Sequence, residues 1–158
     1  MKYVTDENEK KEIESYVGLA AAEAKNSTCK KSQRGAIIVK DGKILGKGHN
    51  KVILEDLCCI RKNIRNNSKV ELCAAIHAEQ MAIINAVNAG KPLNGSRMYI
   101  IKVKDGKIKA SGKPSCTVCS KMIYESGIAE VVLLHENGYA IYNSEEFNEL
   151  SFEYFLKT

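Results

Sequence analysis

Two Asp-Gly dipeptides, Asp41-Gly42 and Asp105-Gly106, constrain the fold more than any other feature of the sequence. Each lies between runs that favour strands, AIIVK and KILGKGHN around the first and MYIIKVK and KIKAS around the second. Asp-Gly tolerates the positive φ angles of a two-residue hairpin turn, so each pair predicts a β-hairpin. The shared string VKDGKI has no third copy, which argues against a repeat architecture.

Helical patterns separate the strand-forming runs. Between residues 6 and 26, apolar residues recur at spacings of three and four, which predicts an amphipathic helix. Further helices are expected over 77–89, 117–126 and 144–156, and further strands over 128–134 and, at a sheet edge, 138–142. Residues 51–73 lack a clear period and are expected to form a long loop. Helices between strands predict an α/β sandwich with partly parallel strands.

Composition narrows the class of protein. A length of 158 residues fits one domain, expected to span 1–158, and 44% hydrophobic with 27% charged residues is ordinary for a globular chain. No apolar run approaches the roughly 20 residues that cross a bilayer, and the first residues contain no apolar signal core. We therefore expect a cytoplasmic protein with no membrane segment, whose six cysteines bind metal or are simply buried.

The net charge of +5 is distributed unevenly. After His135 the chain has five acidic residues and one lysine, so the part before it is more basic than the whole. Such an excess suits an anionic substrate such as a nucleotide, although a lysine-rich solvated surface explains it equally well.

Three side chains have the chemistry of zinc ligands: His77, Cys116 and Cys119. The two cysteines lie three residues apart at the start of an expected helix, so their sulfur atoms share one face, and the helix N-terminus favours thiolates. One imidazole and two thiolates leave a fourth tetrahedral position open, which is typical of catalytic rather than structural zinc. Taken alone, each part has a plainer interpretation, as a redox pair, buried cysteines or a structural histidine.

Glu79 follows His77 at the start of another expected helix. Residues two apart face one pocket only if they lie at the first turn, and the polar segment before Ile76 favours that placement. Zinc lowers the pKa of bound water from about 15.7 to about 7, and a carboxylate beside that water can carry protons to the ring nitrogen and the leaving amine of a base. We therefore expect Glu79 to be catalytic rather than a solvated acid.

The His77-Ala78-Glu79 element, followed by Pro114-Ser115-Cys116 and Cys119, resembles the signature of the cytidine and deoxycytidylate deaminase superfamily. The similarity is widest to deoxycytidylate deaminases and covers roughly residues 10–135. It implies a three-layer α/β/α sandwich with a mixed five-stranded sheet and a zinc cofactor. It also implies hydrolysis of the exocyclic amine of a cytosine nucleotide or nucleoside, foremost deoxycytidylate (dCMP). Family members are commonly oligomers, so a homo-oligomer is expected by analogy.

The resemblance assigns substrate contacts to two further residues. Asn50, after the second expected strand, matches the sugar-contacting asparagine of the family, although a plain turn residue is the alternative. The backbone N–H of Ala78 matches the group that meets the base. Because Asn50 leads into residues 51–73 and His77 follows them, this loop is expected to cover or border the pocket.

The sequence departs from the family pattern in two places. Ser115 separates Pro114 from Cys116, where the family usually has Pro directly before Cys. Residues 102–113 lengthen a connection that is usually short. The spacing of the two zinc-ligand cysteines is intact, so zinc binding should survive, whereas the base contacts and the choice of substrate could differ.

Other residues have weaker assignments. Some deoxycytidylate deaminases hold a second, structural zinc, for which four cysteines are candidates, although adjacent cysteines rarely share one ion and buried free cysteine is common. The four are Cys29, Cys58, Cys59 and Cys73. Tyr139 or Tyr142 could stack on a base, but packing is the commoner role. Charge for a phosphate could come from cations around the first hairpin, each of which could equally be solvated: Lys30, Lys31, Arg34 and Lys51.

Two other functions stay open on the sequence alone. Deamination of tRNA or single-stranded nucleic acid is compatible with the basic charge, but aromatic residues make up only 6% and are not interleaved with basic ones. A non-catalytic zinc-binding protein of the same fold has no need of Glu79, so its presence favours an enzyme. A small pyrimidine nucleotide or nucleoside is the expected partner.

Overall fold

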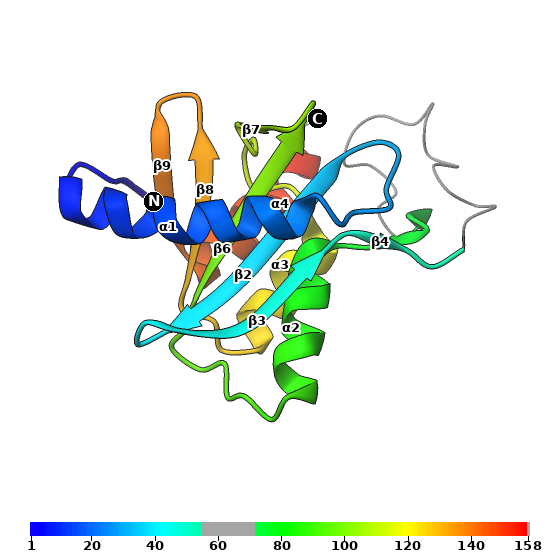
Figure 1. The fold of residues 1–158 in the computed structure, drawn as a ribbon. Coiled ribbons are helices and arrows are strands. Elements are labelled where there is room, and N and C mark those ends of the chain that lie inside the picture. Colours follow the sequence, from blue (N-terminus) through cyan, green and yellow to red (C-terminus); the bar gives the residue numbers. More distant parts are fainter. Residues whose placement is uncertain (55–71, 158) are drawn as a thin grey trace.

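The computed structural model describes residues 1–54 and 72–157 (Figure 1). The four helices within these residues match the expected ones to within two residues at each end: α1 (Glu7–Ala24), α2 (Ala78–Asn88), α3 (Thr117–Glu125) and α4 (Ser144–Leu156). The strands of the main sheet are β1 (Lys2–Tyr3), β2 (Gln33–Lys40), β3 (Lys43–His49), β6 (Arg97–Lys104), β7 (Lys107–Lys109), β8 (Glu130–His135) and β9 (Gly138–Asn143).

Both Asp-Gly pairs form the expected hairpin turns. Asp41 and Gly42 have φ angles of 49° and 72°, and Asp105 and Gly106 have 52° and 72°. Positive φ at both central residues is the type I′ geometry, whose twist matches that of paired strands. The first turn joins β2 to β3 and the second joins β6 to β7, both antiparallel. Local turn chemistry therefore sets the pairing next to each turn, and in the first hairpin an irregularity between Ile38 and Val39 then shifts the register.

The main sheet is mixed, as expected for the α/β class. Its order is β1-β9-β8-β6-β2-β3, with β7 paired to β6 beyond the point where β8 ends. Among the described strands, β6 and β8 form the one parallel pair and the others are antiparallel. The short strands β1 and β7 raise the count to seven from the expected five. The expected edge position of 138–142 is wrong, because β1 pairs with β9 on its outer side.

Helices cover both faces of the sheet, which confirms the three-layer arrangement (Figure 1). On one face, α1 contributes Ile13, Val17 and three alanines to a core with Ile37 of β2 and Tyr99 of β6. On the other face, α2, α3 and α4 pack on the alternate residues of the same strands. Successive strand residues point to opposite faces, so each strand supplies both cores.

Glycine at position 48 sets how closely α2 lies to the sheet. A Cβ added there would be less than 3.0 Å from the backbone nitrogen of Ala82 and the backbone oxygen of Ala78. Only a residue without a side chain fits, because packed carbon atoms need roughly 3.5–4.0 Å. Gly48 therefore lets the first turns of α2 contact β3 directly, and that contact fixes the start of the helix.

The segment expected to be a long loop is described only at its ends. Lys51–Val52 (β4) pairs with Ala75–Ile76 (β5) in a small two-stranded sheet, which the sequence reading did not anticipate. Two-residue strands are too short to show an alternating pattern. Residues 55–71 lie outside the described part of the chain. No helix in the described part is long and apolar enough to cross a membrane.

Candidate active site

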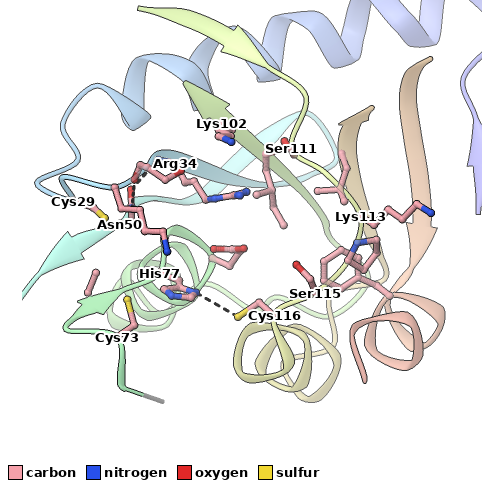
Figure 2. Close-up of a pocket in the computed structure, with 18 residues that line it drawn as sticks. Cys29, Arg34, Asn50, Cys73, His77, Lys102, Ser111, Lys113, Ser115 and Cys116 are labelled. Carbon is pink, nitrogen blue, oxygen red and sulfur yellow. Dashed lines mark hydrogen bonds between the residues drawn. The ribbon is translucent and has the colours of Figure 1, made fainter. Parts of the chain in front are cut away.

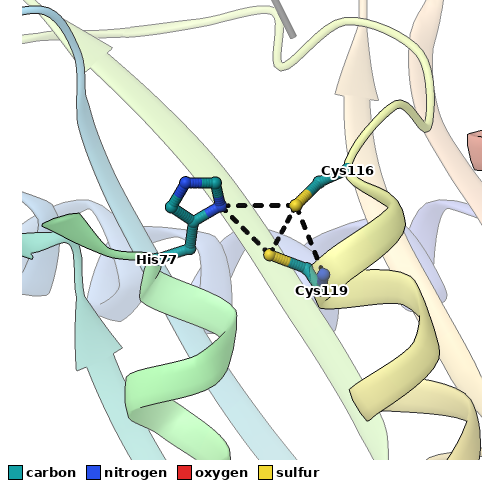
Figure 3. Close-up of side chains that lie close together, drawn as sticks. All are labelled: His77, Cys116 and Cys119. Atoms are coloured by element: carbon teal, nitrogen blue, oxygen red, sulfur yellow. Dashed lines mark hydrogen bonds between the residues drawn. The ribbon is translucent and has the colours of Figure 1, made fainter. Parts of the chain in front are cut away.

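The three expected zinc ligands converge between the starts of two helices (Figure 3). The Nδ1 atom of His77 lies 3.1 Å from the Sγ atom of Cys119 and 3.3 Å from that of Cys116. The two sulfur atoms are 2.8 Å apart. Within the described residues, this is the one group of three or more such side chains whose donor atoms all lie within 4.8 Å of one another.

Helix capping explains why the donors meet. His77 is the N-cap of α2, with extended backbone angles, and its N–H donates to Oε1 of Gln80 at 2.9 Å. Cys116 is the N-cap of α3, and its sulfur accepts from the N–H of Cys119 at 3.3 Å. Both helices therefore direct their N-terminal ends, which carry partial positive charge, at the same point. The expectation that both motifs lie at helix starts is confirmed.

Hydrogen bonding and burial shift the pKa values of these groups. The hydrogen bond from Cys119 outweighs burial and, with His77, lowers the pKa of Cys116 to about 4. Burial would lower the pKa of His77, but its hydrogen bonds to Cys116 and Cys73 raise it to about 10. Burial raises the pKa of Cys119. A thiolate beside a protonated imidazole is the charge pattern of a metal-free site whose ligands must lose protons to bind an ion.

The donor set fits zinc. One imidazole nitrogen and two thiol sulfurs are ligands that zinc prefers, and three protein ligands leave one tetrahedral position open. Glu79 lies in the same pocket but is not one of the converging donors. The site can therefore hold a zinc ion with one position free for a further ligand, beside a carboxyl group that is not used in coordination.

Glu79 is a buried acid with spare hydrogen-bonding capacity. Glu79 is 7% exposed, and its Oε2 has no hydrogen-bond partner among the described residues. Burial raises the pKa of this carboxyl, while the charge on His77 opposes that shift. Buried acids are normally satisfied, so an oxygen free in a cavity suggests a group reserved for a substrate or for water.

These residues line a cavity of about 300 Å³, a volume at the lower end of the range for pockets that bind one small molecule (Figure 2). His77, Glu79 and Cys116 form part of the wall, and Arg34 and Lys102 lie on the side away from His77 and Cys116. Both departures from the family pattern contribute to the lining. Pro114 and Ser115 come from the altered motif, and Lys102, Ser111 and Lys113 come from the lengthened connection.

Asn50 also lines the cavity, but its side chain is largely engaged with backbone. Its Oδ1 accepts from the N–H of Arg34 at 2.8 Å, and its Nδ2 donates to the carbonyl of Ser32 at 2.6 Å. The Asn50 N–H donates in turn to the carbonyl of Arg34 at 3.2 Å. Asn50 therefore links the start of β2 to the end of β3 by hydrogen bonds. One hydrogen of its Nδ2 group stays available to donate to a ligand.

Of the other residues expected to contact the substrate, some line the cavity and some do not. Ala78 is fully buried at the first position of α2 and is not among the residues that line the cavity, although its N–H is one of the four at the helix start without an intrahelical partner. Of the four expected cations, Lys31 and Arg34 line the cavity and Lys30 and Lys51 do not.

The tyrosines and remaining cysteines are also placed. Tyr142 is buried against Phe147, and neither it nor Tyr139 lines the cavity, so packing is the role that the structure gives them. Cys29 and Cys73 line the cavity without joining the group of metal donors. Cys58 and Cys59 lie outside the described residues, and the second zinc stays a prediction.

Lys102 is the main lining residue that sequence reasoning missed as an individual. It interrupts the apolar run MYIIKV of the central strand β6, and lysine is rarely buried in such a strand without a purpose. This charged residue within an apolar run could have marked Lys102 as a candidate from the sequence alone. The direction in which its side chain points could not be predicted, because it depends on how β6 pairs with β2.

Comparison with known proteins identifies the family. Residues 10–135 match the family described as the cytidine and deoxycytidylate deaminase zinc-binding region. The deoxycytidylate deaminase of Mycobacterium phage D29 is 28% identical over 134 residues, which cover 78% of this chain and 94% of that protein. The deoxycytidylate deaminase of Mus musculus is 29% identical over 137 residues, which cover 84% of this chain and 68% of that protein.

Solved structures give the same result. The dCMP deaminase of cyanophage S-TIM5 in its apo form has a TM-score of 0.55 and 28% identity, covering 77% of this chain and 80% of that one. Its complex with dCMP and dUMP has a TM-score of 0.53 and 25% identity, covering 81% and 82% of the two chains. With three side chains at helix starts that could hold a metal ion and a buried glutamate beside them, this chain belongs to the cytidine and deoxycytidylate deaminase family.

Proposed function

We propose that this protein is a zinc-dependent hydrolase that removes the exocyclic amine of a cytosine nucleotide, with dCMP as its best substrate. The reaction consumes one water and releases ammonia, which converts the cytosine ring to uracil. The observation that carries the proposal is the position of Glu79. Its buried carboxyl has a free oxygen in the same cavity as His77 and Cys116.

His77, Cys116 and Cys119 are the residues that would hold the zinc. When bound, zinc acidifies water and polarises it for attack at neutral pH. Every proton movement then falls to Glu79, since no other acidic side chain among the described residues lines the cavity. Its carboxylate takes a proton from the water and gives protons to the ring nitrogen and to the departing amine, the work of a general acid and base.

Two other groups hold the substrate in this proposal. The N–H of Ala78 belongs to the partly positive start of α2, and the remaining Nδ2 hydrogen of Asn50 is free to donate to a sugar hydroxyl. Both roles are carried over from the family pattern. Because Asn50 also clips β2 to β3, its replacement would disturb the cavity wall as well as remove a contact.

The choice of dCMP rests on the relatives and on charge. Proteins named deoxycytidylate or dCMP deaminase cover most of this chain, and one was solved with dCMP and dUMP. In the cavity, the described lining residues include four cations and one acid: Lys31, Arg34, Lys102, Lys113 and Glu79. That excess favours an anionic substrate over a neutral nucleoside.

A panel of substrates tests the proposal. Ammonia release by the zinc-loaded protein is measured with dCMP, deoxycytidine, cytosine, guanine and a cytosine-containing oligonucleotide at one ionic strength. We expect dCMP to exceed deoxycytidine by about 10-fold or more in kcat/KM, the value of one charge-assisted hydrogen bond. No ammonia from any cytosine compound would overturn the proposal, and a preference for guanine or the oligonucleotide would replace its substrate.

We also propose that residues 1–158 act as one domain and that the protein assembles as a homo-oligomer, by analogy with the family. Light scattering of the purified protein measures the assembly directly. A mass equal to one chain would refute this part and leave the chemistry unaffected.

A further inference from the structure

Arg34 and Lys102 form an unusual pair on the cavity wall. The register of β2 with β6 places them directly opposite each other, and both line the cavity. Directly opposed residues on neighbouring strands share a face of the sheet, with Cβ atoms about 4.5–5.5 Å apart. Figure 2 shows both side chains on the side of the cavity away from His77 and Cys116.

The pair costs stability unless an anion lies between its members. Like charges directly opposite each other in a sheet are destabilising. Both side chains are half-buried, so solvent screens the repulsion only in part. Burial and then the charge of Arg34 lower the pKa of Lys102. Neither side chain forms an ion pair or a side-chain hydrogen bond within the described part of the protein. Burial raises the pKa of Glu79 and the charge of Arg34 helps to oppose that shift, but no acidic group is in direct contact with either cation there.

Edge protection does not explain this pair. Lysines on exposed edge strands discourage pairing with other chains, which accounts for Lys107 and Lys109 of β7. Strands β2 and β6, in contrast, lie inside the sheet with partners on both sides. Two cations that face a cavity from two interior strands indicate instead a ligand of opposite charge.

Arg34 is also held in place before any ligand arrives. Asn50 accepts a hydrogen bond from the Arg34 N–H and donates one to its carbonyl, so the backbone at this position is fixed from both sides. A guanidinium that starts from a fixed backbone loses less freedom on binding a phosphate than one on a loop does. Lys31 and Lys113, the other two cations of the lining, are exposed.

We propose that Arg34 and Lys102 together bind the 5′-phosphate of the nucleotide substrate and so determine the preference for a nucleotide over a nucleoside. This inference rests on the proposed function. It places the phosphate against β2 and β6, on the side of the cavity away from His77 and Cys116. The guanidinium donates two hydrogen bonds in a plane, and the ammonium group adds a point charge.

The decisive variant is Lys102→Met, which removes the charge and keeps most of the aliphatic length. Without ligand, the zinc-loaded variant should melt at the same temperature as the parent or higher, because the repulsion is gone. Inorganic phosphate and dUMP should raise the melting temperature of the parent, and this increase should be lost in the variant. Lys107→Met, on the same hairpin but outside the cavity, is the matched control and should behave as the parent.

Kinetics give the second readout. In Lys102→Met, kcat/KM for dCMP should fall about 10-fold or more, while kcat/KM for deoxycytidine changes less than about threefold. Arg34→Met should abolish the same melting shifts, and the double variant should lose little beyond either single one, because both residues serve one phosphate. If one single variant folds poorly, the other single variant still tests the proposal by the same melting and kinetic readouts.

Two results would overturn the inference. One is an equal loss for dCMP and deoxycytidine, which would mean a general role in the cavity. The other is an unchanged melting shift with phosphate and dUMP in both single variants. Either failure leaves deamination of deoxycytidine by the parent intact. If the parent deaminates no cytosine compound, the proposed function fails instead, while the melting shifts still report on the anion site.

Discussion

Replacing Gly48 with alanine should damage both stability and the active site. The added Cβ would lie less than 3.0 Å from backbone atoms of Ala78 and Ala82, in the first two turns of α2. Backbone cannot rotate away as a side chain can, so the helix must retreat by about 1 Å or more to reach normal packing distance. Over-packing of this kind costs about 1–3 kcal/mol of unfolding free energy.

That cost corresponds to a fall in melting temperature of roughly 2–12 °C for a chain of this size. Because α2 begins at His77 and carries Glu79, its displacement also moves the reacting groups. Misplacement near 1 Å can cost up to about 10²-fold in rate. We therefore expect kcat to fall about 10- to 100-fold at saturating zinc.

The matched control is the same substitution at Gly18, in the exposed middle of α1. No heavy atom lies within 4 Å of a Cβ added there, so alanine should stabilise the protein by about 0.5–1 kcal/mol. Denaturant unfolding and steady-state kinetics measure both variants at one zinc concentration. If Gly48→Ala is as stable and as active as Gly18→Ala, the contact between α2 and β3 does not limit either property.

Three further outcomes follow from named contacts. Glu79→Gln should keep zinc content and melting temperature but lose at least about 10²-fold in kcat, since an amide cannot carry the proton; near-parental turnover would assign this work elsewhere. Burial and then Lys113 lower the pKa of His135, which is hydrogen-bonded at 3.1 Å and 3.2 Å to two tyrosine hydroxyls. Its neutral form therefore stabilises the fold above the ordinary pKa of 6.5, and this contribution disappears as the pH falls from 6.5 through the lowered value. Melting curves from about pH 7 to 5 should show a smaller fall for His135→Gln than for the parent, and parallel curves would contradict this. Ile13→Ala, at a position with 0% exposure on the α1 side of the sheet, should cost about 2–5 kcal/mol and leave zinc content unchanged, as chemical denaturation and metal analysis would show.

The sequence predicted those features that depend on neighbouring residues. Asp41-Gly42 and Asp105-Gly106 specify their turns because the two residues adopt the φ angles that the turn needs. Cys116 and Cys119 share a face because the spacing of three is a helical property. The meeting of His77 with these cysteines was expected only from the motif as a whole, since nothing local relates residues so far apart.

Features that depend on long-range pairing were missed. β1 has two residues and no pattern of its own, and it is a strand only because β9 offers a free edge. Lys102 reaches the cavity because β6 pairs with β2 in a particular register, which no local signal reveals. The hydrogen bonds of Asn50 to Ser32 and Arg34 likewise exist only once β2 and β3 are adjacent. The family motif predicted that Asn50 lies at the site, whereas only the fold reveals that it also joins β2 to β3 by hydrogen bonds.

We propose that one zinc held by His77, Cys116 and Cys119 makes this protein a cytosine deaminase. The most direct measurement strips the metal and follows the conversion of dCMP to dUMP by absorbance as zinc is added back, with Cys119→Ser run beside the parent. Activity should be absent without metal, rise with added zinc and level off near about one zinc per chain, and Cys119→Ser should bind little zinc and gain little activity. Full turnover by the stripped protein, or zinc binding and activity in Cys119→Ser equal to those of the parent, would contradict the account.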